Sequence, residues 1–87
     1  MIINIKDLKN KIIYRANYRG TKEMDKLLGA FTKTYINHLN DMELQLLCNL
    51  LNFDDENLYK FYQGQETTIF IELNKVTKLF KNYEYLK

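Results

Sequence analysis

The sequence contains no serine, no proline and no tryptophan, and it has a single histidine, His38, and a single cysteine, Cys48. Without serine, a Ser/His/Asp nucleophile cannot be assembled, and a Cys/His pair would have to use these two residues. A zinc or iron–sulfur site built from protein ligands alone needs clustered Cys and His, and the sequence has no such cluster. We therefore expect no catalytic residue, no metal site and no enzymatic activity of the chain's own.

A lone cysteine also excludes a disulfide within the chain, which suits a reducing cytosol better than a secretory compartment. No apolar run approaches the ~18–20 residues that a membrane span requires. The first ten residues, MIINIKDLKN, lack the apolar core of a signal peptide and the Arg/Ser-rich character of a transit peptide. We therefore expect a cytoplasmic protein with no membrane-inserted segment.

Glycine is scarce, and the 87 residues are 46% hydrophobic and 28% charged, as in ordinary soluble domains. A chain of this length buries only roughly 60–65% of the surface that its unfolded form exposes. No repeat, linker or low-complexity stretch suggests a second domain. We expect residues 1–87 to form a single domain whose small core leaves little room for a deep catalytic cavity.

Apolar spacing predicts helices along the first half of the chain. Residues 6–19 carry a helical pattern, which Gly20 interrupts. After Gly20 comes the clearest helical stripe of the sequence. Its members are Met24, Leu27, Leu28, Phe31, Tyr35 and Leu39.

Capping signals predict where the next helices begin and end. Asn40 is followed three residues later by Glu43, the pattern of a capping box, and a leucine-rich segment comes next. Asp54 starts a second segment of the same kind, and Gly64 is suited to end it because glycine adopts positive φ without penalty.

From Thr67 onward, Ile69, Leu73, Val76 and Phe80 again follow helical spacing, although the string TTIFI alone is compatible with a strand. We interpret this segment as a fifth helix. The predicted fold class is therefore all-α, a small bundle of about five short helices in a single domain.

Charge is unevenly distributed along the chain. Residues 1–38 carry eight Lys or Arg against three acidic residues, residues 39–66 carry one against six, and residues 67–87 carry four against two. This pattern is compatible with a basic face that meets an acidic partner, and equally with solvated helix surfaces that happen to segregate.

The turn around Gly20 has a purely structural interpretation. Gly20 would make the turn and cap the second helix, and Glu23, at the third helical position, would face the unpaired backbone amides there. Arg19 would then be an ordinary solvated cation. His38 and Cys48 are likewise interpreted as structural, because nothing in their spacing brings them within hydrogen-bonding reach.

The same turn carries a family resemblance. The string Arg19-Gly20-Thr21-Lys22-Glu23, followed by Met24-Asp25 and an apolar helix, resembles the Arg-Gly-x-x-Glu signature of the SdhE-type FAD assembly factors, the succinate dehydrogenase assembly factor 2 family. Downstream, the segments 39–44 and 50–59 and Gly64 match that family's landmarks in order, so the resemblance is strongest over residues 11–64. Tyr18 departs from the family pattern, because many relatives have a second arginine there.

The resemblance implies an assembly chaperone that binds the flavoprotein subunit of succinate dehydrogenase or fumarate reductase and promotes covalent attachment of FAD to it. It implies that this chain binds no cofactor stably and acts on the FAD of its partner. We further expect a monomer that binds no nucleic acid. The resemblance also predicts that a partner-binding surface gathers around the turn, at Arg19, Gly20, Glu23, Met24, Asp25, Tyr14 and Tyr18.

Two other functions compete with this interpretation. A nucleic-acid-binding bundle could use the basic first 38 residues, but the segment has only two arginines and the acidic middle of the chain would repel phosphate. A regulatory protein–protein interaction module, such as an antitoxin-like protein, would use the same surface as the chaperone and stays open at this point.

Overall fold

The computed structural model describes residues 4–85, and this part of the chain contains helices but no strand. The prediction of an all-α bundle is therefore confirmed. None of the helices in residues 4–85 is long and apolar enough to cross a membrane. The five helices are α1 (Ile5–Asn17), α2 (Lys22–Tyr35), α3 (Asp41–Leu50), α4 (Asp55–Tyr62) and α5 (Lys75–Lys81).

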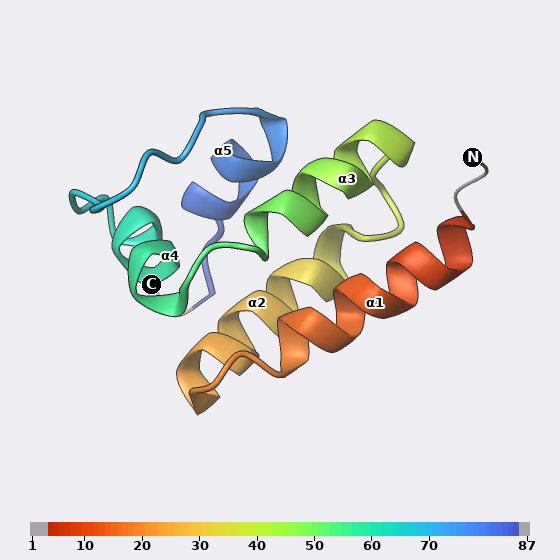
Figure 1. Ribbon diagram of the computed structural model, residues 1–87, viewed down its shortest axis with the longest axis horizontal. Helices are drawn as coiled ribbons and strands as arrows, with labels where there is room; N and C mark the ends of the chain where they lie inside the picture. Colours follow the sequence, from red (N-terminus) through yellow and green to blue (C-terminus); the bar gives the residue numbers. More distant parts are fainter. Residues whose placement is uncertain (1–3, 86–87) are drawn as a thin grey trace.

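The first two helices form an antiparallel hairpin, in which α1 and α2 lie side by side along their lengths (Figure 1). The third helix packs against α1 on one side and against α5 on another, and α5 also contacts α4. The turn between α1 and α2 therefore lies at one end of a hairpin that packs against the rest of the bundle.

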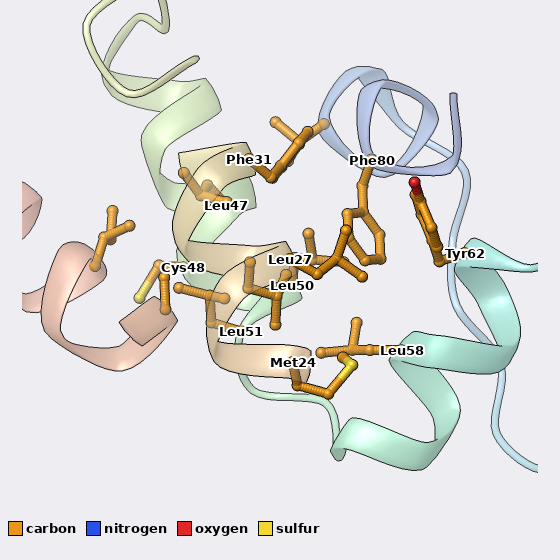
Figure 2. Close-up of a cluster of buried hydrophobic side chains, with 14 of the residues drawn as sticks. Met24, Leu27, Phe31, Leu47, Cys48, Leu50, Leu51, Leu58, Tyr62 and Phe80 are labelled. Carbon is orange, nitrogen blue, oxygen red and sulfur yellow. The ribbon is translucent and has the colours of Figure 1, made fainter. Parts of the chain in front are cut away.

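The core gathers apolar side chains from all five helices, including Ile12 and Ala16 of α1, and Figure 2 shows part of this cluster. Phe31 of α2 meets Phe80 of α5 edge to face, with ring centroids 5.3 Å apart. Phe80 in turn contacts the ring of Tyr62 of α4 at 5.3 Å. Aromatic pairs in this geometry contribute about 0.5–1.5 kcal/mol each beyond the area that they bury, so these rings tie the carboxyl-terminal helix to the hairpin.

The predicted caps of α3 and α4 are confirmed. The side chain of Asn40 accepts a hydrogen bond from the backbone N–H of Glu43 at 2.8 Å, and the Glu43 carboxylate accepts from the Asn40 N–H at 2.9 Å. The Asp54 side chain caps α4. Gly64, with φ of +75°, follows the end of α4 as expected. Each side-chain cap contributes about 0.5–2 kcal/mol.

The predicted fifth helix is wrong in its first half, because α5 begins at Lys75 and residues 65–74 are irregular. Of the apolar residues that suggested the helix, Val76 and Phe80 lie in it and are buried. Ile69 and Leu73 lie outside it and are 40% and 57% exposed.

Long-range contacts explain this difference. The Thr68 backbone N–H donates to the side-chain oxygen of Asn57 in α4, at 2.9 Å, and Ile71 inserts into the core. β-branched Thr and Ile have low helix propensity, so there is little intrinsic cost in leaving this stretch irregular. The helix starts only where Asn74 and Thr77 form a capping box.

The second helix is shorter than the stripe of apolar residues predicted. It ends at Tyr35, and residues 36–38 form a turn in which Ile36 is buried. Leu39 therefore packs on the core from the connection to α3 rather than from α2.

Glu43 links the starts of two helices, because its carboxylate also lies 2.6 Å from the ammonium group of Lys75 at the start of α5. The Lys75 hydrogen bond, followed by that of the Asn40 N–H, holds the pKa of Glu43 below its usual 4.5. A lowered pKa in the folded state means that this stabilisation is complete above pH 4.5 and is lost as the pH falls through the folded-state value.

We therefore expect Glu43→Gln to lower the melting temperature at pH 7 and to have a progressively smaller effect as the pH falls toward 3. Glutamine keeps the capping oxygen and removes the charge, so the variant reports the ion pair with Lys75 together with the charge's interaction with the start of α3. Melting temperatures between pH 7 and pH 3 would measure this, with Glu66→Gln, at an exposed loop position, as the matched control. A gap between wild type and Glu43→Gln that is constant with pH would contradict the assignment.

Candidate functional site

The candidate site is the turn that joins α1 to α2. Gly20 lies in this turn with φ of +134°, a conformation that side chains with a Cβ rarely adopt. The N-cap of α2 is Thr21, whose hydroxyl accepts from the Met24 backbone N–H at 3.2 Å. The expectation that Gly20 caps the helix is wrong by one residue, and Glu23 is consequently the second helical residue rather than the third.

Arg19 points into the molecule. Its Nε donates to Asp55 Oδ1 at 2.9 Å, and its two terminal nitrogens donate to the carbonyl oxygens of Leu51 and Phe53, each at 2.6 Å. The side chain is only 10% exposed. The expectation that Arg19 presents its guanidinium outward is therefore wrong: three internal acceptors hold the group against its own molecule.

The carbonyl groups at the end of α3 explain why the Arg19 side chain points into the molecule. The last turn of α3 contains no basic residue, although the carbonyls at a helix C-terminus carry a partial negative charge. Arg15 of α1 and Arg19 of the turn that follows it supply the missing donors. Besides Arg19, Arg15 donates to the side-chain oxygen of Asn52 at 2.6 Å and to the Leu51 carbonyl at 3.4 Å.

Two carboxylates complete this arrangement. Asp55 lies in the first turn of α4, where the helix dipole also favours a negative charge, and it pairs with Arg19. Asp25, in α2, accepts a hydrogen bond from the Arg19 backbone N–H. The side chain and the backbone of Arg19 are thus both held, and the turn is joined to the end of α3 and the start of α4 as well as to α2.

Met24 and Asp25 also serve the fold. Met24 is 4% exposed and belongs to the apolar core, where Figure 2 shows its side chain beside Leu58. The expectation that Met24 contacts a partner is therefore not supported by its position. Asp25 is partly exposed, with one oxygen already used by Arg19.

Four residues of the predicted set do face solvent. Glu23 is exposed, and its carboxylate has no hydrogen bond or ion pair with any residue in the range 4–85. Tyr14 and Tyr18 are 65% and 70% exposed, and their ring centroids are 4.6 Å apart. Gly20, which lies between Tyr18 and Glu23 in the sequence, is also exposed. We call these residues, Tyr14, Tyr18, Gly20 and Glu23, the turn surface.

Sequence reasoning missed the residues that hold the turn surface in place, namely Arg15, Asp55 and the carbonyls of Leu51 and Phe53. A partial signal existed, because the leucine-rich segment that became α3 has no basic residue near its end. That signal indicates that a positively charged side chain is needed at the end of α3, but it does not identify the residue that provides it.

Neither single-copy residue forms a site. His38 is exposed in the turn after α2, whereas Cys48 is buried in α3 with the Arg15 guanidinium 3.9 Å from its sulfur. Within residues 4–85, no group of three or more His, Cys, Asp or Glu side chains is placed to hold a metal ion.

Comparison with known proteins points to one family. Residues 10–84 match the family model described as flavinator of succinate dehydrogenase. The chain is 25% identical over 75 residues to the FAD assembly factor SdhE of Pseudomonas savastanoi, covering 86% of this chain and 89% of that protein. It is 33% identical over 58 residues to the SdhE of Legionella pneumophila, covering 67% and 72%.

A mitochondrial relative is similar over a shorter part of its length. The chain is 30% identical over 57 residues to succinate dehydrogenase assembly factor 2 of Arabidopsis thaliana, which covers 66% of this chain but only 30% of that protein. No solved structure gives a significant match.

The internal contacts of Arg19 predict a large effect on stability. We expect Arg19→Lys to lower the free energy of unfolding by about 3 kcal/mol, because one ammonium group cannot reach three acceptors and leaves buried groups unpaired. Arg15→Lys, at a more exposed position with a side-chain acceptor in solvent, should cost only about 1 kcal/mol. Urea unfolding of both variants would measure the difference. An Arg19→Lys variant as stable as wild type would show that the guanidinium does not hold the turn.

Proposed function

The chain belongs to the family of succinate dehydrogenase flavinators, and from that membership we propose that it is an assembly chaperone for a flavoprotein. Its client is the flavoprotein subunit of succinate dehydrogenase or fumarate reductase, and its effect is to promote the covalent attachment of FAD to that subunit. The observation that carries this proposal is the family match over residues 10–84. The names of the bacterial relatives, which are FAD assembly factors, support it.

The atoms that form the new bond belong to the client and to its FAD. Covalent flavin attachment needs a client histidine held against the isoalloxazine ring, and correct positioning alone can supply several kcal/mol of the barrier. A partner that binds the attachment-competent arrangement more tightly shifts the client toward it without adding a reactive group. We therefore propose that this chain is not itself an enzyme.

The turn surface is the part of the chain that we propose meets the client. Glu23 offers an exposed carboxylate, the two tyrosines offer exposed rings in contact with each other, and Gly20 lets another backbone approach closely. A standard interface uses about 800 Å² per partner, roughly one-seventh of the 5995 Å² that this molecule exposes. Arg19 contributes by holding the turn in place, which lowers the ordering cost of binding.

We propose that FAD stays with the client throughout. A groove between α1 and α2 has a volume of about 270 Å³. Pockets for drug-sized ligands occupy about 300–1,000 Å³, and FAD is a large dinucleotide, so this groove does not fit it. The chain would then act on the flavin only through the polypeptide that holds it.

This proposal predicts that Glu23→Gln separates binding from stability. Because Glu23 is exposed and only its charge near the helix N-terminus contributes to the fold, we expect the free energy of unfolding to change by less than about 1 kcal/mol. Loss of a charge that is paired in the interface should weaken client binding by about 2–5 kcal/mol and slow flavin attachment.

The measurement combines calorimetric titration of the purified client subunit with its covalent flavin fluorescence after denaturing electrophoresis. Glu66→Gln, which removes an exposed glutamate from the loop after α4, is the matched control and should leave both readouts unchanged. If wild-type chain and Glu23→Gln bind the client equally well, the turn surface is not where the client docks.

A further inference from the structure

The hairpin of α1 and α2 carries a groove beside the turn surface. It is about 270 Å³ in volume and runs between the two helices, which lie side by side in Figure 1. Its apolar walls are Ile13 of α1 and Ile36, which directly follows α2. Thr32 and Gly29 of α2 also line it.

A small residue, Gly29, and the polar side chain of Asn17 determine the shape of the groove at one end. The side chain of Asn17 lies across Gly29, where a Cβ would come within 2.5 Å of the Asn17 Oδ1 atom. Asn17 also donates to the Ile13 carbonyl at 2.8 Å, which fixes it at that end of the groove. Near the other end, Lys9 donates to the side chain of Asn37, another residue of the lining, at 3.2 Å.

The groove also contains an unpartnered hydroxyl. Thr32 is 1% exposed, and its Oγ1 atom has no hydrogen-bond partner in the part of the chain that the structure describes. Two residues later, Thr34 shows the usual solution, because its hydroxyl donates to the Ala30 carbonyl at 2.8 Å. Since buried polar groups are almost always paired, the Thr32 hydroxyl needs a partner from outside residues 4–85, and a bound protein segment could supply it.

The charges around the groove indicate what kind of partner would fit it. Lys33 lines the groove and Lys9 lies at its end, whereas none of the acidic residues in the described part of the chain lines it. The surrounding residues 1–38 carry eight Lys or Arg against three acidic residues. A partner segment that carries an apolar side chain next to a negatively charged group would complement both the apolar walls of the groove and the lysines at its edge.

We propose that this groove is a second docking site for the flavoprotein client, which inserts one apolar side chain between Ile13 and Ile36 and places a neighbouring carboxylate on Lys33. A hydrogen-bonding group of the inserted segment reaches the Thr32 hydroxyl. This inference rests on the proposed function and adds to it a site outside the Arg19–Glu23 motif.

Position and size favour a protein segment over a free small molecule. The groove volume lies below the range of drug-sized ligands but accommodates a single large side chain. Adjacent residues of a helix point about 100° apart around its axis, so Ile13 of the groove and Tyr14 of the turn surface lie on different faces of α1. A client that contacts both the tyrosines and the groove therefore has to extend around this side of α1.

Thr32→Val gives a test in which stability and binding move in opposite directions. Valine has nearly the same shape and removes an unpaired buried hydroxyl, so the melting temperature of the free chain should stay the same or rise. Affinity for the purified client subunit, measured by calorimetric titration, should fall about five- to thirty-fold, because the group that satisfied the hydroxyl loses its partner. Wild-type affinity in Thr32→Val would overturn the assignment of this hydroxyl to the interface.

Lys33→Glu tests the charge, and Lys78→Glu is its matched control. Both lysines are exposed and lie in the last turn of their helices, so each reversal removes the same kind of helix-dipole interaction. We expect Lys33→Glu to weaken client binding about ten-fold or more at low salt, with the difference shrinking as salt is added, and Lys78→Glu to bind like wild type. Equal affinities of the two variants would overturn the proposed carboxylate contact.

The outcomes separate the two proposals. A wild-type chain that does not bind the client overturns the proposed function and the groove assignment together. If wild type binds and Glu23→Gln does not, while Thr32→Val and Lys33→Glu bind normally, the turn surface stands and the groove is not a docking site. Loss of affinity in all three variants, with folding intact, supports both surfaces.

Discussion

The structure depends on one guanidinium. Arg19 bridges the carboxyl end of α3 and the amino end of α4, where the carbonyls of Leu51 and Phe53 and the carboxylate of Asp55 converge. The two helix ends carry opposite partial charges, and a cation and an anion placed between them satisfy both. Because Arg19 comes from the turn after α1, the same contacts also attach the α1–α2 hairpin to the α3–α4 corner. The turn surface is held in place by these contacts and not by its own four residues, all of which are exposed.

The string from Arg19 to Met24 therefore divides into residues that face inward and residues that face outward. Arg19 and Met24 build the fold, and Gly20 supplies a backbone conformation that few other residues tolerate. Glu23 is left with an exposed carboxylate that no residue between positions 4 and 85 pairs. Loss of function in a motif variant is consequently ambiguous unless stability is measured beside it. A variant at Arg19 can abolish client binding by releasing the turn, whereas one at Glu23 acts on the surface alone. Shared membership in a short motif does not imply a shared physical role.

The features that could be predicted from the sequence are those that depend on neighbouring residues. The caps at Asn40 and Asp54 and the end of α4 at Gly64 each involve groups within a few positions of one another, so the local pattern determines them. The helix predicted from residue 67 does not begin there, because the helical spacing of residues 67–74 competes with a hydrogen bond from Thr68 to Asn57, eleven positions away. The contacts of Arg19 are even less predictable from the local sequence. Its acceptors lie 32 to 36 positions along the chain and two of them are backbone carbonyls, which any residue type supplies and no sequence pattern reveals.

The internal use of both arginines also determines what the basic half of the chain offers to a partner. Arg15 and Arg19 are the only arginines in the sequence, and both are engaged with α3 and its following turn. The outward positive charge of this half is therefore carried by lysines, including Lys33 at the groove. Lysine is a strongly hydrated point charge on a flexible stem and forms weaker, less directional contacts with carboxylates than the planar guanidinium does. Such contacts attract an acidic surface and add little to the lifetime of the complex, which is the balance that a chaperone needs if it is to leave its client once the flavin is attached.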